Sequence, residues 1–391
     1  KMENKKKIKK IKKLLFITPR NPFSGRFSGD VVRAKKFTEH FKKKFSVTLL
    51  TLDKNISSQK KFENLNLITF KEKNFFFKFF YFLKFLLKLQ PMQLGYFYSP
   101  KINEFIKKNY YDFDLILLQS LRVTQYFFTS ENKKKYLDMG DLYSSNYLQT
   151  SKSKNIFNPL KYIYLFESML IKKYEELCFK KFDKIFLFSK KEVKAVNKFK
   201  SKIEQINFGI DKIKKKFKYN NKNNKIIFIG NINYLPNRDA CIYFTKNILP
   251  KVIDRDPSIE FHIVGSISKI DKFLFERNKS IKVHGEVNNL DYIIKKSFCG
   301  LANLNISTGI QTKILTYMSF GLPCISSTKV VKSFDKLNSN IIASYKNDDE
   351  LIKLIFKFKN DRIFSTKISQ KSFKTIKKFK WNAILNKIKF I

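Results

Sequence analysis

The stretch "IIFIGNINYLPNRDACIYFTKNILPKV", residues 226–252, reads as a strand, a turn and a helix. Four apolar residues lead into Gly230, and the apolar residues beyond the turn recur at helical spacing. A glycine at such a point lets a ligand approach the backbone closely. Asn231, Asn233 and Asn237 place neutral amide groups around the same turn. The stretch therefore predicts a βα unit of a parallel sheet with a binding edge at its turn.

The same strand-then-glycine pattern occurs twice more downstream. "FHIVGS" (261–266) ends at Gly265 and Ser266, and "VHGEV" (283–287) contains Gly285. Short apolar strands that alternate with helices predict a doubly wound parallel sheet, whose ligands bind at the carboxyl ends of the strands. The chain has no GxxxxGK[ST], which argues against a P-loop ATPase, and no GxGxxG, which argues against a nicotinamide enzyme.

"STGIQTKILTYMSFGLPCISS" (307–327) predicts the next helix of this half. Thr308 and Gln311 have the spacing of a capping box, and Gly321 stands where the helix would end. Helix amino termini attract anions. We therefore expect a helix that opens near Thr308 and whose amino end holds an anion.

The first half begins with its own βαβ pattern. "KLLFITP" (13–19) is a buried-type strand, and a loop rich in Gly, Ser and Pro, a helix and a second strand (46–53) follow it. A polar run at 212–225 has the composition of a linker. The predicted fold class is α/β, with two Rossmann-like doubly wound parallel-sheet domains facing a cleft. The expected ranges are 12–208 for the first domain, 209–370 for the second, and 371–391 for a closing helix that packs back on the first.

Composition places the chain among globular proteins with an anion-attracting surface. The 391 residues are 43% hydrophobic, with a formal net charge of +48. Only eight residues are Arg, so nearly all of the positive charge is Lys, as an AT-rich genome would impose. A dedicated nucleic-acid binder would use more Arg, so no specific nucleic-acid partner is expected. The scattered four Cys and three His show no metal-ligand spacing, so neither a metal nor a cofactor is expected.

Residues 71–91, "KEKNFFFKFFYFLKFLLKLQP", predict a basic amphipathic helix. Its lysines fall on one side and Phe, Tyr and Leu fill the rest, as in helices that lie in a bilayer interface. An ordinary helix that covers a sheet and turns its Lys stems to water gives the same pattern. Both interpretations stay open. No run is long and apolar enough to predict a transmembrane helix.

Candidate site residues of the first half follow predicted strands. Gly25, Gly29 and Asp30 lie in the loop after the first strand, where small residues would let a substrate approach. A plain βα turn explains them equally well. Asp138 and Asp141 follow another strand and are candidates for orienting a substrate hydroxyl. Three weaker candidates, at the end of a further strand, are Gln119, Ser120 and Arg122.

Taken in order, these motifs resemble the retaining GT-B glycosyltransferases often called glycosyltransferase family 4. "FIGNINYLPNRDACIYFTKNILPKV", "FHIVGS", "VHGEV" and "GIQTKILTYMSFGLPCISS" resemble its nucleotide-sugar-binding domain. "LLFITPRNPFSGRFSGD", "YLDMGDLYSS", "FDKIFLFSKKEV" and "INFGID" resemble its first domain and the crossover. The resemblance spans almost the whole chain and looks closest to sugar transferases of polysaccharide gene clusters.

The resemblance implies transfer of a sugar, with retention, from a nucleotide-sugar to a hydroxyl of a glycan or lipid-linked acceptor. It implies a donor diphosphate near the amides of Gly309, Ile310 and Gln311, with Lys313 adding positive charge if it faces the cleft. No metal is needed for this chemistry. The donor-binding set would be Gly230, Asn231, Asn233, Asn237, Gly265, Ser266, Gly285, Thr308, Gly309, Ile310, Gln311 and Thr316, and the catalytic set Asp141, Asp138 and Lys313.

The chain departs from the family pattern at two pairs of positions. Near Gly230, Asn231 and Pro236 stand where the family often has an Arg and a Lys that hold the diphosphate. Thr308 and Thr316 stand where the family commonly has two glutamates, the second of which usually binds the donor ribose. This leaves open a degenerate, non-catalytic GT-B protein with a basic surface for membranes or polyanions, and a nucleotide-sugar epimerase as a further alternative. For an active transferase we expect a cytoplasmic location, peripheral on the inner face of the cell membrane, with an anionic surface as partner of 71–91.

Overall fold

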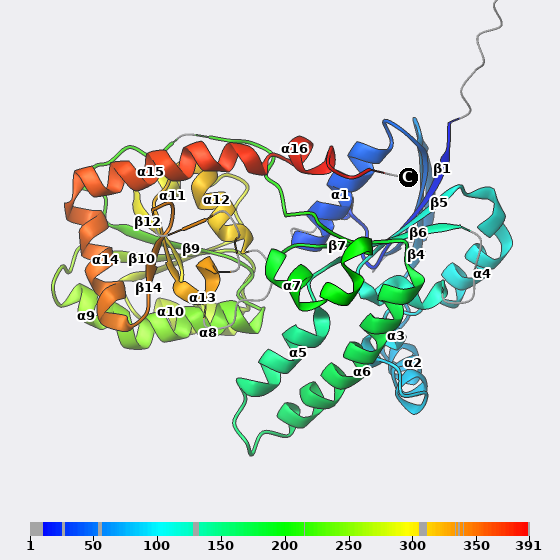
Figure 1. The fold of residues 1–391 in the computed structure, drawn as a ribbon. Coiled ribbons are helices and arrows are strands. Elements are labelled where there is room, and N and C mark those ends of the chain that lie inside the picture. Colours follow the sequence, from blue (N-terminus) through cyan, green and yellow to red (C-terminus); the bar gives the residue numbers. More distant parts are fainter. Residues whose placement is uncertain are drawn as a thin grey trace, which may run out of the picture. The chain divides into compact units, whose positions relative to one another are not determined.

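A computed structural model describes residues 11–389 except 26–27, 54–56, 128–132, 215, 305–310, 333, 335–336 and 339. The chain forms two compact units (Figure 1). Unit 1 comprises residues up to Phe188 together with Glu192–Ile206, and unit 2 comprises Ser189–Lys191 together with Asn207–Ile391. The main division therefore falls two residues before the predicted boundary.

Unit 1 is built on an eight-stranded sheet. Its strand order is β3-β4-β2-β1-β5-β6-β7-β8, and every neighbouring pair is parallel except β3 with β4. The order reverses between β1 and β5, and such a reversal opens a crevice at the carboxyl ends of the two strands. The strands are β1 (Lys13–Thr18), β2 (Ser46–Asp53), β3 (Ser58–Phe62), β4 (Leu65–Lys71), β5 (Leu115–Gln119), β6 (Lys134–Gly140), β7 (Lys184–Leu187) and β8 (Ile203–Gln205).

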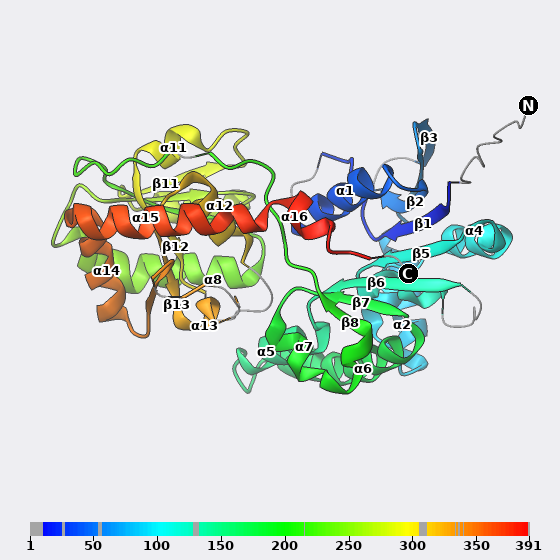
Figure 2. The same cartoon turned by 45° about the horizontal axis from the view of Figure 1, so that its top comes forward.

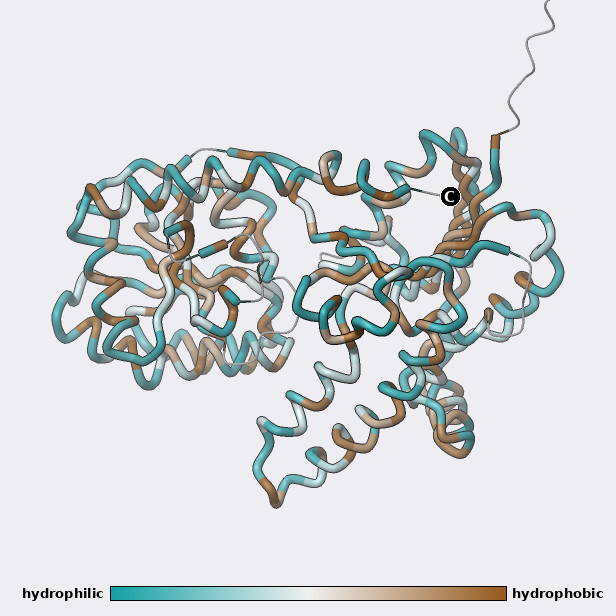
Figure 3. Tube along the Cα trace, viewed as in Figure 1, coloured by the Kyte–Doolittle hydropathy of each residue, from teal (hydrophilic) through white to brown (hydrophobic). Residues whose placement is uncertain are grey.

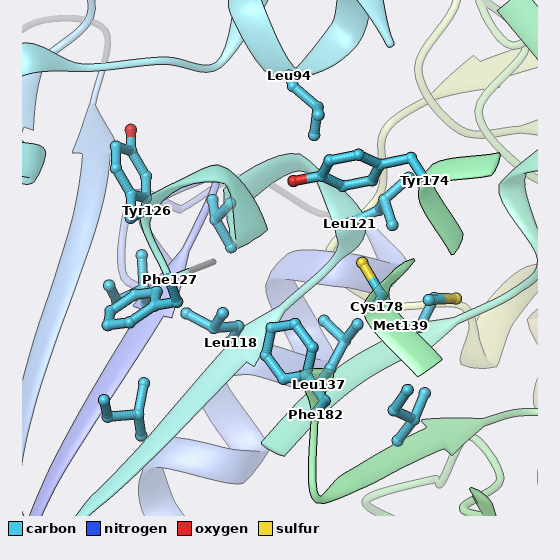
Figure 4. Close-up of a cluster of buried hydrophobic side chains, with 14 of the residues drawn as sticks. Leu94, Leu118, Leu121, Tyr126, Phe127, Leu137, Met139, Tyr174, Cys178 and Phe182 are labelled. Atoms are coloured by element: carbon cyan, nitrogen blue, oxygen red, sulfur yellow. The ribbon is translucent and has the colours of Figure 1, made fainter. Parts of the chain in front are cut away.

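The sheet of unit 1 is buried because its central strands are apolar on both sides. All five residues of β5 are buried. Leu118 of β5 and Leu137 of β6 belong to one apolar cluster with Tyr174 and Cys178 (Figure 4). The last two residues come from α6, which therefore covers one face of the sheet. The helices of unit 1 are α1 (Gly29–Phe41), α2 (Phe75–Leu87), α3 (Met92–Tyr96), α4 (Pro100–Asn109), α5 (Tyr143–Lys152), α6 (Pro159–Lys181) and α7 (Lys190–Ala195).

Unit 2 has a six-stranded parallel sheet in the order β11-β10-β9-β12-β13-β14. Numbered within the unit, this is 3-2-1-4-5-6, the order of dinucleotide-binding folds, with its reversal between β9 and β12. The strands are β9 (Lys225–Ile229), β10 (Glu260–Val264), β11 (Ile281–Gly285), β12 (Ser297–Ala302), β13 (Cys324–Ser327) and β14 (Ala343–Tyr345).

Helices lie on both faces of this second sheet, with α15 along one face and α8 and α10 along the other (Figure 1). α8 and α10 each return the chain to the start of the next parallel strand, whereas α15 follows the last strand. The helices of unit 2 are α8 (Leu235–Tyr243), α9 (Leu249–Ile253), α10 (Lys269–Glu276), α11 (Asp291–Lys295), α12 (Thr312–Phe320), α13 (Thr328–Val331), α14 (Asp348–Asn360), α15 (Arg362–Ile376) and α16 (Trp381–Leu385).

The predicted fold class, two doubly wound α/β units, is confirmed. Two predicted helices need correction. The helix expected to open near Thr308 begins at Thr312, after Gln311 as its capping residue, so the capping-box register is wrong. The separate closing helix expected over 371–391 is also wrong, because α15 continues to Ile376 and α16 is a short helix. Packing of this segment on the first domain stays a prediction.

Two glycines at the carboxyl edge of unit 2 differ in what surrounds them. A Cβ on Gly265, where φ is +133°, would lie 1.9 Å from the carbonyl oxygen of Gly230. A Cβ on Gly285, where φ is +68°, would meet no atom within 4 Å. Gly265 is therefore required by contact between two backbones, whereas Gly285 is required only by its own dihedral angle.

We predict that Gly265→Ala lowers the free energy of unfolding by about 3 kcal/mol or more, because the backbones of β9 and β10 would have to separate. Gly285→Ala should cost about 1 kcal/mol, which is the penalty of the left-handed conformation alone. Urea unfolding of the two variants measures both values. Equal losses would contradict the close approach at Gly265.

Candidate functional site

The turn after β9 lies against the turn after β10 at the carboxyl edge of unit 2. The amide of Gly230 donates to the carbonyl of Val264 (2.9 Å), and the amide of Ile232 donates to the carbonyl of Ser266 (2.7 Å). The amide of Gly265 donates in turn to the carbonyl of Gly285 (2.7 Å). The structure thus brings together the three glycines that the sequence singled out, beside the reversal point of the sheet.

The three predicted asparagines have different surroundings. Asn231 and Asn233 are exposed, and the amide nitrogen of the Asn233 side chain lies 3.2 Å from the hydroxyl of Ser266. Asn237 is buried and donates to the backbone carbonyl of Asn231 (2.8 Å). Asn231 and Asn233 can therefore present polar groups to a ligand, whereas Asn237 fixes the shape of the turn.

Lys313 is buried inside unit 2. Its ammonium donates to Oδ1 of Asn237 (2.8 Å) and lies 4.7 Å from the centre of the Phe228 ring. Burial lowers the pKa of Lys313 to about 8. The expectation that Lys313 presents its charge directly to a donor does not agree with this placement. Its side chain instead acts on the Gly230 turn through Asn237, which makes it a positioning residue.

Tyr317 of α12 fills the gap where pairing between β9 and β12 stops. The paired residues end at Ile227 and Gly300. Beyond them the Tyr317 hydroxyl accepts from the amide of Ile229 (2.9 Å) and lies 3.1 Å from the carbonyl oxygens of Ile227 and Leu301. In the sequence, Tyr317 is only part of the stretch predicted to form a helix, with no assigned role. A buried tyrosine hydroxyl needs a hydrogen-bond partner. This requirement could have indicated from sequence that Tyr317 bonds to neighbouring strands.

The amino end of α12 is only partly described. Thr308, Gly309 and Ile310 lie outside the described residues, so their expected contacts with an anion stay predictions. Gln311 is half-exposed at the capping position, without a side-chain bond to the helix amides. Thr316 is half-exposed, and its hydroxyl donates to the carbonyl of Thr312 (3.1 Å).

In unit 1, polar residues gather at the reversal between β1 and β5. Asp30, at the start of α1, is ion-paired with Arg20 and accepts from the hydroxyl of Ser28 (2.6 Å). Burial raises the pKa of Asp30, but Arg20 and Ser28 together outweigh burial and leave it lowered. Gln119 donates to the backbone carbonyl of Asp30 (2.8 Å), which joins the end of β5 to the start of α1.

The loop glycines of unit 1 lie beside this group. Gly25 has a φ of +78°, and a Cβ built on it would meet no atom within 4 Å. Gly29 is the first residue of α1. A cavity of about 670 Å³ adjoins the loop, and its polar lining includes Arg20, Asn21 and Asp53. The expected contact of Gly25, Gly29 and Asp30 with an acceptor stays a prediction.

Asp138 forms a buried ion pair with Arg33. Its carboxylate accepts two hydrogen bonds from the guanidinium of Arg33, both of 2.7 Å, and both residues are buried. The guanidinium also lies over the rings of Phe37 (4.5 Å) and Phe188 (4.7 Å). This placement does not favour the expected contact of Asp138 with a substrate, because the side chains of α1 already occupy its oxygens. Its function here is to hold α1 on β6.

Asp141 lies three residues further on, among other carboxyl groups. Its Oδ1 is buried without a hydrogen-bond partner among the described residues. Burial and the nearby Glu192 raise the pKa of Asp141 well above its ordinary value. Glu192 accepts from the amide of Leu142 (2.9 Å), and Glu175 accepts from the amide of Ser144 (3.1 Å). A buried carboxyl oxygen that lacks a partner can take a substrate hydroxyl or hold a proton.

Tyr143 extends this group toward the end of β5. Its hydroxyl lies 2.8 Å from that of Ser120, which has an unusual positive φ of +77°. Arg122 stacks on the ring of Tyr143 (5.4 Å) and donates to Gln93 (3.1 Å). Ser120 and Arg122 were weak candidates from sequence, and Tyr143 was missed. Its position at the start of α5, directly after the Asp141 turn, was the signal.

Two classes of feature are not found in the described part of the chain. No group of three or more His, Cys, Asp or Glu residues there could hold a metal ion. None of the described helices combines the length and the apolar character that spanning a membrane requires.

Comparison with known proteins agrees with this geometry. Residues 223–361, which lie in unit 2, match the family model described as Glycosyl transferases group 1. No curated protein matches the chain in sequence.

Solved structures extend the likeness to both units. Sucrose-phosphate synthase from Thermosynechococcus elongatus has a TM-score of 0.71 at 12% identity, over 96% of this chain and 97% of that one. HepE from Anabaena, solved with UDP and glucose, has 0.65 at 11%, over 96% and 98%. TarM has 0.53 at 16%, over 70% of this chain and 53% of TarM, so the match spans about half of TarM. These structures show that the fold is GT-B.

We predict that burial of Lys313 makes stability depend on pH. The unfolded chain keeps this proton up to the ordinary value of 10.5, whereas the folded chain releases it near pH 8. Between these values the unfolded state binds more protons. The free energy of unfolding should therefore rise with pH relative to Lys313→Met, by up to about 3 kcal/mol.

Urea unfolding of wild type and Lys313→Met at pH 7, 8.5 and 10 checks this rise. Lys353→Met, at an exposed position of α14, is the matched control and should run parallel to wild type. A wild-type curve parallel to that of Lys313→Met would show that the ammonium is exposed to water.

Proposed function

We propose that this chain, whose residues 223–361 match the glycosyl transferases group 1 model, is a glycosyltransferase that uses a nucleotide-sugar donor. We further propose that it transfers the sugar, with retention of configuration and without a metal ion, to an acceptor hydroxyl. The product would be a cell-surface polysaccharide or glycolipid. The enzyme would act in the cytoplasm, peripheral on the inner face of the membrane.

One observation carries the proposal. The family match covers the whole carboxyl edge of unit 2 at the reversal between β9 and β12, which includes Gly230, Gly265 and Gly285. Phosphate-containing ligands of such folds bind at this point of the sheet. HepE has been solved with UDP and with UDP-glucose, which supports a uridine nucleotide as the first donor to try.

The donor side would act by neutral hydrogen-bond donors and a helix amino end. Asn233 and the half-exposed Ser266 present side-chain donors beside the reversal point. α12 begins after the segment that follows β12, and the helix dipole favours an anion near its amino end. Negative charge grows on the diphosphate as the sugar leaves, so donors fixed in advance would lower the barrier.

The acceptor side would lie in unit 1. The loop of Gly25, Gly29 and Asp30, with its adjoining cavity, offers space and polar groups for a sugar or polyol. The unpartnered oxygen of Asp141 offers the acceptor hydroxyl a hydrogen-bond acceptor. Tyr143 and Ser120 add hydroxyls at the neighbouring strand end.

We predict saturable binding of a nucleotide-sugar, with slow hydrolysis when no acceptor is present. Calorimetric titration with UDP-, GDP- and dTDP-sugars measures the binding, and release of the nucleoside diphosphate measures turnover. Asn233→Ala should weaken donor binding about 5–10-fold by removing one hydrogen bond. Asn247→Ala, at an exposed position of unit 2 where the side chain bonds only its own helix, should leave binding unchanged.

Indifference of the chain to every nucleotide-sugar would remove the proposal. Binding without any release of nucleoside diphosphate, when a pool of glycan and lipid-linked acceptors is added, would indicate a non-catalytic binding protein. Isomerisation of the donor sugar without an acceptor would indicate an epimerase.

For Asp141→Asn we predict opposite effects on activity and stability. Transfer should fall by about 10²–10⁴-fold, because the amide cannot accept the proton of the acceptor hydroxyl. The pKa of Asp141 is raised in the folded chain. The free energy of unfolding of wild type therefore falls as the pH rises above the ordinary pKa of 3.8. The variant should therefore be more stable than wild type at pH 7.

Thermal unfolding and initial rates of the same samples measure both effects. Asp112→Asn, at an exposed position of unit 1, is the matched control and should change neither. Full activity of Asp141→Asn would exclude Asp141 from the acceptor site.

A further inference from the structure

The helix α2 turns its apolar side chains outward. All thirteen of its residues are described, and none is buried. Six large apolar side chains are exposed by 40–85% and fall within about 140° of the helix circumference. They are Phe75, Phe76, Phe79, Phe80, Leu83 and Leu87. Four exposed phenylalanines on one helix face far exceed the scattered single apolar residues of ordinary surfaces.

The charges around this face are all positive. Lys73 and Lys84 border the stripe along one side, and Lys84 and Lys88 are exposed. Residues 73–91 contain no Asp or Glu. Lys78, by contrast, points to the packed side, where it is ion-paired with Glu72 (2.6 Å) and lies over Tyr96 (4.7 Å). The outer face of α2 is therefore apolar at its centre and basic at its edge.

The hairpin of α5 and α6 carries a second exposed apolar surface. Phe157, in the turn between the two helices, is 91% exposed, and the first turns of α6 continue the apolar surface. Lys172 and Lys173 follow on the exposed side of α6. Figure 3 shows the apolar colour at the tip of this hairpin and along α2. The exposed apolar residues of the hairpin are Ile156, Phe157, Leu160, Tyr162, Ile163, Leu165, Phe166 and Met169.

A short helix between them connects the two faces. α3 packs on α2 so closely that a Cβ on Gly95 would lie 2.2 Å from the carbonyl oxygen of Tyr81. The amino end of α3 is held by Glu167 of α6, whose carboxylate accepts from the amides of Met92 (3.0 Å) and Gln93 (3.3 Å). α2 and α6 also lie on the same side of the unit 1 sheet in both views (Figures 1 and 2). α3 therefore holds the two apolar surfaces together on one side of unit 1.

We propose that α2 and the α5–α6 hairpin form a two-part docking surface for an anionic lipid bilayer. The apolar side chains enter the interface region, and the bordering lysines bind the anionic headgroups. Charge selects this partner over a second copy of the chain, because a second copy would bring lysines against lysines with no acid in 73–91 to compensate. The proposal rests on the peripheral membrane location proposed above and names its contact surface, but it does not depend on the transfer reaction.

Sedimentation of the full chain with vesicles of phosphatidylcholine, with and without 30% phosphatidylglycerol, tests the proposal. Wild type should partition at least tenfold more strongly onto the anionic vesicles. Phe76→Ser with Phe80→Ser should reduce partitioning by about tenfold or more, because two large apolar side chains no longer enter the interface. Lys84→Glu with Lys88→Glu should lose about fivefold or more per lysine on anionic vesicles only.

Matched controls separate this surface from general stickiness. Ile270→Ser with Phe273→Ser removes two exposed apolar side chains (73% and 66%) from α10 of unit 2 and should leave partitioning unchanged. Phe157→Ser tests the hairpin independently and should weaken partitioning about threefold or more. Thermal unfolding verifies that each variant is folded, and donor binding should be the same in all, so failure here differs from failure of the proposed transferase.

Three results would overturn the proposal. The first is equal partitioning of wild type onto the two kinds of vesicle. The second is unchanged partitioning of Phe76→Ser with Phe80→Ser. The third is a concentration-dependent dimer, seen by analytical ultracentrifugation without lipid, that the same double variant abolishes, because this would assign the face to a second copy.

Discussion

The candidate donor edge depends on one hydroxyl, that of Tyr317, at the point where β9 and β12 stop pairing. The amide of Ile229 would otherwise be a half-buried donor without a protein partner, a defect that costs about 1 kcal/mol. By accepting from this amide, Tyr317 fixes α12 to the last residue of β9. The turn that begins at Gly230 and the helix that follows β12 are thereby held in one arrangement, and a binding site at a reversal point needs that arrangement.

Local pattern predicted the fold well, and the candidate site only in part. Alternation of apolar strands and helices, with glycine at strand ends, is visible over a few residues, so both sheets were predictable. Burial of a polar side chain is decided by residues far away in sequence. Lys313 shares a helix face with Tyr317, four residues on, and both are buried. Nothing near Asp138 in sequence shows that Arg33 occupies its carboxylate, whereas Asp141, beyond the strand end, is left without such a partner.

The two units differ in the chemistry of their carboxyl edges. The edge of unit 2 carries asparagine and serine side chains, which are neutral donors suited to a charged ligand. The edge of unit 1 holds carboxyl groups whose pKa values are displaced in opposite directions, with Asp30 lowered by Arg20 and Ser28 despite burial, and Asp141 raised by burial and Glu192. Carboxyl groups so separated in acidity can take different roles in one reaction.

The fork that Arg33 makes with Asp138 also explains a feature of the composition. Nearly every cationic residue of the chain is lysine, and only eight are arginine. Three of the arginines form ion pairs with aspartates (Arg20, Arg33 and Arg238), and a fourth, Arg122, lies over the ring of Tyr143. Lysine at position 33 would keep the charge but could not bond both oxygens of Asp138 in one plane, and lysine at position 122 could not lie flat on the ring of Tyr143. At these two positions the planar shape of the guanidinium, and not its charge alone, holds neighbouring elements of unit 1 together.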